Sequence, residues 1–182
     1  TRLDMLKSKT HYESPISREG GFLLNNVLFL TATFAVFWGV MFPIISEALT
    51  GDKITVSAPY FNAVMVPIGL LLLLLTGIGP LLAWRKTSSQ SLKRHFAYPT
   101  LFGLLCAIVP AVLGVRDIYA LISFACSGLV TGTIVSEFHR GALARGSSSG
   151  ESYIMALINL TRRNKRRYGG YVVHFGIVLL FI

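Results

Sequence analysis

The chain has 182 residues, of which 53% are hydrophobic and only 14% charged, and its formal net charge is +9. An ordinary soluble domain is about 25% charged, so this chain is more apolar and less charged than an ordinary globular protein, and the long apolar runs described below exclude a water-soluble enzyme. It also argues against a nucleic-acid partner, because the basic residues are distributed as in a membrane protein, as shown below.

Long apolar runs follow one another along the chain. Backbone groups in lipid must pair within their own segment, so a membrane-crossing run is expected to be a helix. Such a helix takes about 20 apolar residues to cross about 30 Å of hydrocarbon. Four uncharged runs meet this requirement, at residues 22–42, 61–84, 99–115 and 118–136. A fifth run, 171–182, is cut off by the chain end, so we interpret the chain as an internal piece of a longer polypeptide. The pattern predicts an all-α polytopic transmembrane helix bundle with four complete spans and a truncated fifth.

Prolines and cysteines inside these runs have structural interpretations. We expect Pro43 to mark the exit of the first span, and Pro67 and Pro110 to bend the second and third. Cys106 and Cys126 lie in apolar runs without a C-x-x-C spacing, so thiol redox chemistry and covalent haem attachment to this chain have no support. We interpret both thiols as small buried hydrophobic groups.

The 17 Lys and Arg residues are divided unequally between the two sides that the spans define. Fifteen lie in the N-terminal segment, the loop 85–98 and the loop 139–170, and the other side has only Lys53 and Arg116. By the positive-inside rule the side with fifteen is cytoplasmic. The basic net charge therefore indicates membrane topology rather than nucleic-acid binding.

The cytoplasmic loop 139–170 contains two distinct segments. Residues 141–150, which include ARGSSSG, have the composition of a flexible linker. Residues 151–160, ESYIMALINL, have helical spacing and precede the basic run RRNKRR. We expect this helix either to lie along the inner membrane surface, near anionic lipid headgroups, or to pack against the bundle.

Four histidines occur in the chain, and one of them is unusual. His11, His95 and His139 stand among charged residues outside the runs, where we expect solvated loop side chains. His174 lies seven residues past Arg167, roughly 10 Å deeper along a helix that rises 1.5 Å per residue. An ionisable side chain at that depth of the bilayer is rare and indicates function.

The residues around His174 favour a large flat ligand. Gly170, at i−4, shares the helical face of His174 and leaves room for the edge of a macrocycle. Arg167, at i−7, is placed to meet an acid group near the interface. A neutral imidazole binds iron, zinc or copper through one nitrogen, and haem combines iron with a flat macrocycle and two propionates.

Two alternatives to haem remain open for His174. One is a structural histidine that hydrogen-bonds a neighbouring helix across a close glycine contact. The other is a proton relay in a secondary transporter or channel-like protein. The relay is weakened because the runs contain no acid, Glu137 standing just after the fourth, and because no internal repeat is apparent.

Three separated segments resemble the CcmF family of cytochrome c maturation proteins, in the order of that family. They are SPISREGGFLLNNVLFL at 14–30, ITVSAPYFNAVMVPIGLLLLLLTGIGPLLAW at 54–84 and RRYGGYVVHFGIVLLFI at 166–182. In the first segment we interpret Ser17 and Glu19 as the cap and first turn of a helix rather than as catalytic groups.

The resemblance implies part of a haem lyase of the bacterial inner membrane, which attaches haem to C-x-x-C-H motifs of apocytochrome c. Implied partners are apocytochrome c, a haem chaperone, other cytochrome c maturation subunits and the lipid bilayer. The family holds haem b through two transmembrane histidines, and His174 matches the later one. His174 would then be an axial ligand of the haem iron, with Gly170, Tyr171 and Arg167 as further cofactor-binding residues. The resemblance assigns no catalytic residue here, and the chain alone would be inactive because the other histidine lies outside it.

Overall fold

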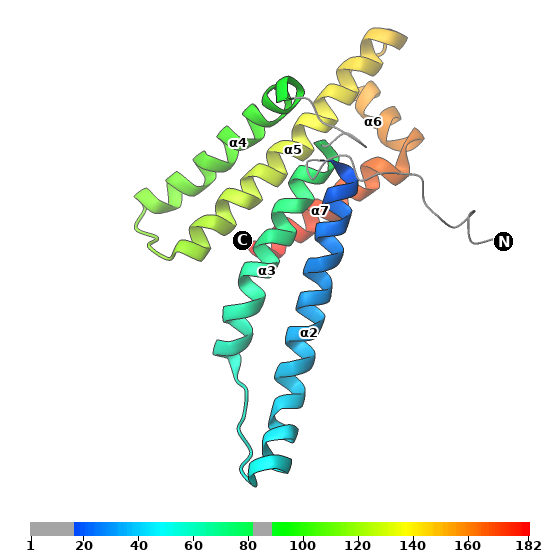
Figure 1. Ribbon diagram of the computed structural model, residues 1–182. Coiled ribbons are helices and arrows are strands. Elements are labelled where there is room, and N and C mark those ends of the chain that lie inside the picture. Colours follow the sequence, from blue (N-terminus) through cyan, green and yellow to red (C-terminus); the bar gives the residue numbers. More distant parts are fainter. Residues whose placement is uncertain (1–16, 82–88) are drawn as a thin grey trace, which may run out of the picture.

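The computed structural model describes residues 17–81 and 89–182, and within these ranges it contains helices and no strand. The helices are α2 (Arg18–Thr50), α3 (Ala58–Ile78), the short 3₁₀ helix η1 (Gly79–Leu81), α4 (Ser89–Val112), α5 (Ile118–Ser149), α6 (Tyr153–Arg163) and α7 (Lys165–Phe181) (Figure 1). The four helices α2 to α5 are long and apolar enough to cross a membrane. The predicted all-α bundle is therefore confirmed, and the 17-residue α7 contains the fifth run except its last residue.

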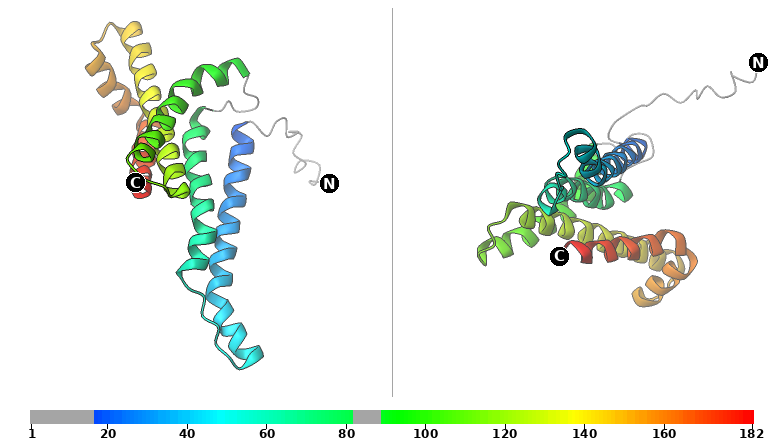
Figure 2. Two further views of the ribbon diagram at one scale, coloured as in Figure 1. Left: turned by 90° about the vertical axis from the view of Figure 1, so that its left-hand side faces the viewer. Right: turned by 90° about the horizontal axis from the view of Figure 1, so that it is seen from below.

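The helices form two hairpins and a returning arm around α5. In Figures 1 and 2, α2 and α3 make one long hairpin, α4 and α5 make a second beside it, and α6 and α7 turn back along α5. Helix α5 contacts α3, α4, α6 and α7, so it is the centre of the bundle. Leu73 of α3, Val130 of α5 and Val178 of α7 are each at most 1% exposed and belong to one core cluster.

The helix of the first predicted span has the predicted N-cap, but it ends later than expected. Ser17 caps α2, and its Oγ accepts a hydrogen bond from the Gly20 N–H at 3.1 Å. The prediction that Pro43 marks the exit is wrong, because α2 continues past it until Gly51, whose φ of 80° ends the helix. A proline removes a single N–H from the helix, and the Ser46 hydroxyl donates to the Pro43 carbonyl at 2.9 Å. One missing donor is too little to end a helix of this length.

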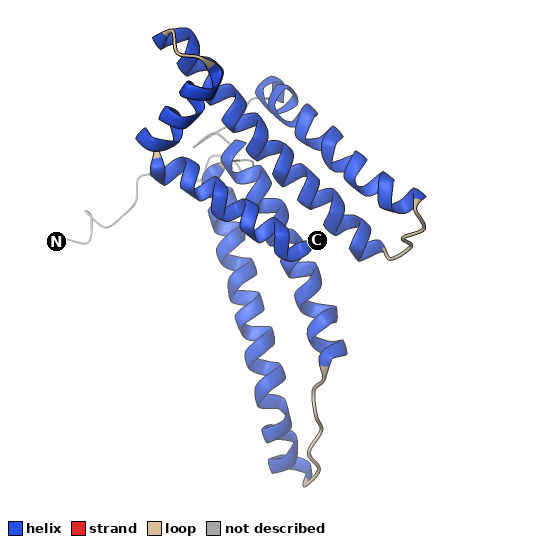
Figure 3. Ribbon diagram, turned by 180° about the vertical axis from the view of Figure 1, so that it is seen from behind, coloured by secondary structure: helices blue, strands red, loops and turns tan. Residues whose placement is uncertain are grey.

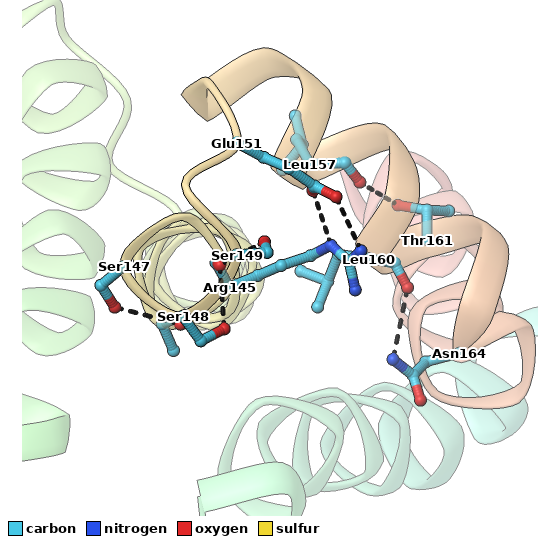
Figure 4. A network of polar contacts seen from close by, with 10 residues as sticks. Arg145, Ser147, Ser148, Ser149, Glu151, Leu157, Leu160, Thr161 and Asn164 are labelled. Carbon is cyan, nitrogen blue, oxygen red and sulfur yellow. Dashed lines mark hydrogen bonds and ion pairs between the residues drawn. The ribbon is translucent and has the colours of Figure 1, made fainter.

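The predicted flexible linker at 141–150 is also wrong. Helix α5 runs through it to Gly150, where a φ of 65° ends the helix. Across this corner Arg145 of α5 forms a bidentate pair with Glu151, with N–O distances of 2.9 and 3.0 Å (Figure 4). The guanidinium lowers the pKa of the Glu151 carboxyl by hydrogen bonding to its charged form. The serine hydroxyls donate to backbone carbonyls within the preceding turn, so this composition is compatible with a helix; they belong to Ser147, Ser148 and Ser149.

The structure also bears on the histidines and on the helix that were predicted outside the apolar runs. His95 and His139 lie within α4 and α5, not in solvated loops, because both helices extend beyond their apolar runs. His11 and residues 82–84 of the second predicted span lie outside the described residues. The helix expected at 151–160 is α6, which packs on α5 through the buried Ala156 and Leu160.

Helices α4 and α5 approach each other closely at glycines. A Cβ on Gly103 would lie 2.6 Å from the Ala125 carbonyl oxygen, and one on Gly128 would lie 2.8 Å from the Cys106 side chain. Small residues allow membrane helices to gain van der Waals contact along their backbones. Cys106 and Cys126 are free thiols, the second buried and the first partly buried, as expected for small packing groups.

We predict that Gly103→Ala destabilises the protein by about 1–3 kcal/mol, because the new methyl group meets a backbone oxygen that has no rotamer to change. Gly169→Ala is the matched control, since a Cβ there meets nothing within 4 Å and alanine favours a helix. Thermal unfolding of the full-length protein in detergent measures both changes. Equal melting temperatures for the two variants would contradict the close α4–α5 contact.

Candidate functional site around His174

Helix α7 is fixed on α5 at both of its ends. Near its start, the buried rings of Tyr168 and Tyr171 pack around Phe138 of α5, with ring centroids 4.9 and 6.0 Å from that of Phe138. Near its end, the Ser123 hydroxyl of α5 donates to the Phe181 carbonyl at 2.7 Å. The position of α7 along α5 is therefore set by specific contacts.

A buried carboxylate joins the two helices. Glu137 of α5 is 8% exposed, and its Oε2 accepts hydrogen bonds from Arg167 Nη2 at 2.6 Å and from the Tyr171 hydroxyl at 3.1 Å. Its Oε1 accepts from Arg140 on the same helix. A buried carboxylate is tolerated when its charge is paired and both oxygens are hydrogen-bonded. The sequence suggested that Glu137 stands at the end of the fourth helix. It lies inside that helix instead, because α5 extends to Ser149.

His174 lines a cavity between α7 and the α2–α3 hairpin. Figure 3 shows α7 crossing this hairpin near the start of α2 and the end of α3. The cavity has a volume of about 350 Å³, within the range of roughly 300–1,000 Å³ common for small-molecule sites. Its described lining residues are Arg18, Gly21, Phe22, Asn25, Leu72, Leu75, Thr76, Gly79 and His174.

The imidazole of His174 retains unused binding capacity. Its Nδ1 is buried and has no hydrogen-bond partner among residues 17–81 and 89–182. A neutral imidazole has one donor and one acceptor nitrogen, and a buried polar group without a partner costs about 1–3 kcal/mol. The described helices therefore give no support to a structural histidine bonded across to a neighbour, and they leave the ring available to a ligand.

The glycines of α7 have open space beside them. A Cβ on Gly169, Gly170 or Gly176 would meet no atom of another element within 4 Å among the described residues. This differs from the α4–α5 contact, where added Cβ atoms would clash. Close helix packing within the described bundle thus does not require these glycines, and the surface next to Gly170 has room for another group.

The structure divides the predicted site into two parts. Arg167 and Tyr171 are bound to Glu137 on the α5 side, whereas His174 lines the cavity beside α2 and α3. Among the described lining residues the one Lys or Arg is Arg18, which the sequence indicated only as one of the basic residues of the N-terminal segment. A pattern along one helix identifies a shared face, but it gives no information on which distant helix meets that face.

Four membrane-length apolar helices and a histidine-lined cavity define the chain as a polytopic helical membrane protein with a candidate ligand site. The chain is a homologue of the CcmF and CycK proteins, which confirms the family resemblance. It is 40% identical over 96 residues to the cytochrome c-type biogenesis protein CycK of Rhizobium meliloti, a match that covers 53% of this chain and 14% of that protein.

Two further relatives carry the name cytochrome c-type biogenesis protein CcmF. The Haemophilus influenzae protein is 27% identical over 168 residues, which is 90% of this chain and 24% of that protein. The Pseudomonas fluorescens protein is 34% identical over 101 residues, which is 56% of this chain and 15% of that protein. The chain thus spans about a quarter or less of the length of these relatives. No family model and no solved structure matches it.

We predict that Glu137→Gln loosens α7, because the variant loses the charge that attracts Arg140 and Arg167. Those side chains are 37% and 62% exposed, so water can hydrate them in the variant. The free energy that holds α7 on α5 should therefore fall by about 1–2 kcal/mol, less than the 3–5 kcal/mol lost when a fully buried ion pair is broken. Hydrogen exchange in residues 165–181 of the full-length protein should accelerate.

The exposed Glu47→Gln is the control for this experiment, because it makes the same chemical change on α2, away from α7. Exchange in 165–181 should be the same in this control as in the wild type. Unchanged exchange in both variants would show that Glu137 does not hold α7.

Proposed function

We propose that the chain is part of a membrane subunit of cytochrome c maturation and supplies His174 as one axial ligand of a bound haem b. The observation that carries this proposal is the buried, unpartnered Nδ1 of His174 at a cavity between three helices. The homology of the chain to proteins named for cytochrome c biogenesis supports the choice of haem as the ligand.

The residues at the cavity fit such a group. The imidazole of His174 is a common haem iron ligand, and the open surface at Gly170 leaves space for a macrocycle edge. Phe22, Leu72 and Leu75 line the cavity with apolar side chains. No group of three or more His, Cys, Asp or Glu side chains comes together in the described part of the chain. A cofactor that brings most of its own iron ligands therefore suits this site better than a bare metal ion.

The charged residues have separate roles in this proposal. Arg18 lines the His174 cavity, and its guanidinium suits the carboxylate of a propionate. Arg167 and Tyr171, expected at the cofactor, instead hold α7 on α5 through Glu137. They position His174 rather than contacting the ligand. Haem held there would supply one-electron redox chemistry.

The wider function belongs to the same proposal. In this proposal the complete protein lies in the bacterial inner membrane, with its basic loops in the cytoplasm as the positive-inside rule predicts. There it takes part in haem transfer and covalent attachment, together with apocytochrome c, a haem chaperone and other maturation subunits. A proton relay is less well supported, because the described lining of the His174 cavity contains no carboxylate and Glu137 is bound by two guanidinium groups.

We predict that His174→Ala in the full-length protein abolishes the b-type signal of a reduced-minus-oxidised absorption spectrum, because the iron loses an axial ligand. His139→Ala is the matched control, since it removes a histidine from α5 on an exposed surface and should leave the spectrum unchanged. A wild-type spectrum in His174→Ala would overturn the ligand assignment.

Loss of folding and loss of ligation are separated by a second variant. In His174→Gly the space of the ring is free, so added imidazole should restore a six-coordinate spectrum if only the ligand was lost. A protein that had lost its bundle would not respond. Failure of imidazole rescue in a variant that still elutes as a folded protein would count against iron ligation.

We also predict that Arg18→Gln weakens haem retention about tenfold, by removing a charge-assisted hydrogen bond to a propionate. Arg166→Gln is the control, because Arg166 is exposed on α7 and lies outside the cavity lining. The measurement is the haem content per protein after repeated transfer to apomyoglobin. Equal haem loss from the two variants would assign the effect to general charge rather than to Arg18.

A further inference from the structure

A second cavity lies beside α5, between this helix, α4 and the start of α6. It has a volume of about 540 Å³ and is lined by residues of α4, α5 and α6. The described lining residues are His95, Tyr98, Val135, Ser136, His139, Arg140 and Tyr153. Six of these seven side chains carry a polar group, in a chain that is 53% hydrophobic. The cavity takes no part in the proposed haem site, because the two cavities share no described lining residue.

The polar groups of this cavity are arranged around one guanidinium. Arg140 contacts His95 through Nη1 and Glu137 through Nη2. These two contacts use two of its five N–H donors. Because arginine only donates, the ring nitrogen of His95 is the accepting group in this contact. On the far side, His139 Nδ1 and the Tyr153 hydroxyl lie 3.1 Å apart, which connects α5 to the start of α6.

The net charge around the cavity favours an anion. The only described carboxylate bound to Arg140 is Glu137, which does not line the cavity and is shared with Arg167. The guanidinium groups of Arg140 and Arg167 and the carboxylate of Glu137 together carry one excess positive charge. A guanidinium with donors remaining and neighbouring hydroxyl groups is the arrangement that binds phosphate oxygens.

The cavity lies at the boundary between apolar and basic parts of the chain. His95 begins the apolar window of α4, and Val135 stands at the end of the uncharged run of α5. Tyr98 and Tyr153 are about half exposed there, as tyrosines at a membrane interface often are. Beyond them α6 combines exposed Ile154 and Met155 with two arginines in its last turn, which is typical of a helix at the membrane surface.

We propose that this cavity binds the phosphate group of an anionic phospholipid, with Arg140 as its charged partner and the hydroxyls of Ser136, Tyr98 and Tyr153 as further hydrogen-bonding groups. Basic pockets between membrane helices on the cytoplasmic side recognise acidic headgroups in this way. The acyl chains would lie along the exposed apolar side chains of α4, which include Leu101, Leu104 and Leu105.

The test is to count retained lipids by native mass spectrometry on the full-length protein in detergent. The probes are phosphatidylglycerol and phosphatidylcholine with identical acyl chains. The wild type should retain one phosphatidylglycerol about tenfold more tightly than phosphatidylcholine, since a hydrogen bond to a charged group has an effect of that size. Arg140→Gln should remove this preference, whereas the exposed Arg166→Gln should keep it.

A variant that preserves every charge guards against indirect effects of Arg140 on Glu137. Ser136→Leu fills part of the cavity, and it should lose the bound phosphatidylglycerol by the same factor. An unchanged preference in Ser136→Leu, or equal losses in Arg140→Gln and Arg166→Gln, would show diffuse attraction to basic residues and overturn the proposal. Saturable binding of inorganic phosphate without phosphatidylglycerol retention would overturn the lipid assignment.

Discussion

The buried carboxylate of Glu137 determines how α7 is seated, and the candidate site depends on that seating. Its oxygens bind Arg140 on the same helix but Arg167 and Tyr171 on α7, so only the last two contacts constrain the relation between helices. Successive residues of a helix are rotated by about 100°. With Tyr171 directed at α5, His174 three residues later is turned about 60° away from it, towards the side where α2 and α3 lie. The charge pairing thus fixes which neighbours the histidine meets.

Two different kinds of contact hold the bundle together. Helices α3, α4 and α5 meet at glycines, where a Cβ on Gly77, Gly103 or Gly128 would come within 3 Å of a neighbouring helix. Helix α7 meets α5 through aromatic rings and a charged hydrogen-bond network instead. Close backbone contact leaves no space for a ligand. Helix α7, in contrast, contacts α5 through one face, and the space beside Gly170 and Gly176, near His174, stays open. Glycine therefore allows close packing between α4 and α5, whereas in α7 it leaves open space beside the helix.

Much of the fold was predictable from the sequence because length and polarity determine which segments can cross a membrane. Helix ends were less predictable. Pro43 removes one donor from α2, yet the helix continues to Thr50. The hydroxyls of Ser147, Ser148 and Ser149 donate to carbonyls of the preceding turn, so the serine-rich segment also remains helical. His174 was identifiable because a polar ring is conspicuous in an apolar run. Its neighbours across the cavity were not, because Arg18 and Thr76 come from helices whose approach to α7 is decided by packing.

The basic residues show why a charge count predicts topology but not site chemistry. Arg18, Arg140 and Arg167 are all among the fifteen Lys and Arg that the sequence predicts on one side, and the positive-inside rule treats them as equivalent. In the structure Arg167 neutralises a buried acid, Arg140 connects that acid to a second cavity, and Arg18 lines the cavity of His174. From the sequence, Arg167 was predicted to meet an acid group of the ligand because, at seven residues before His174, it is rotated by only about 20° from that residue. A long side chain can leave its helical face to reach a carboxylate on a neighbouring helix, so the partner of an arginine is decided by the nearest buried acid rather than by its own position on the helix.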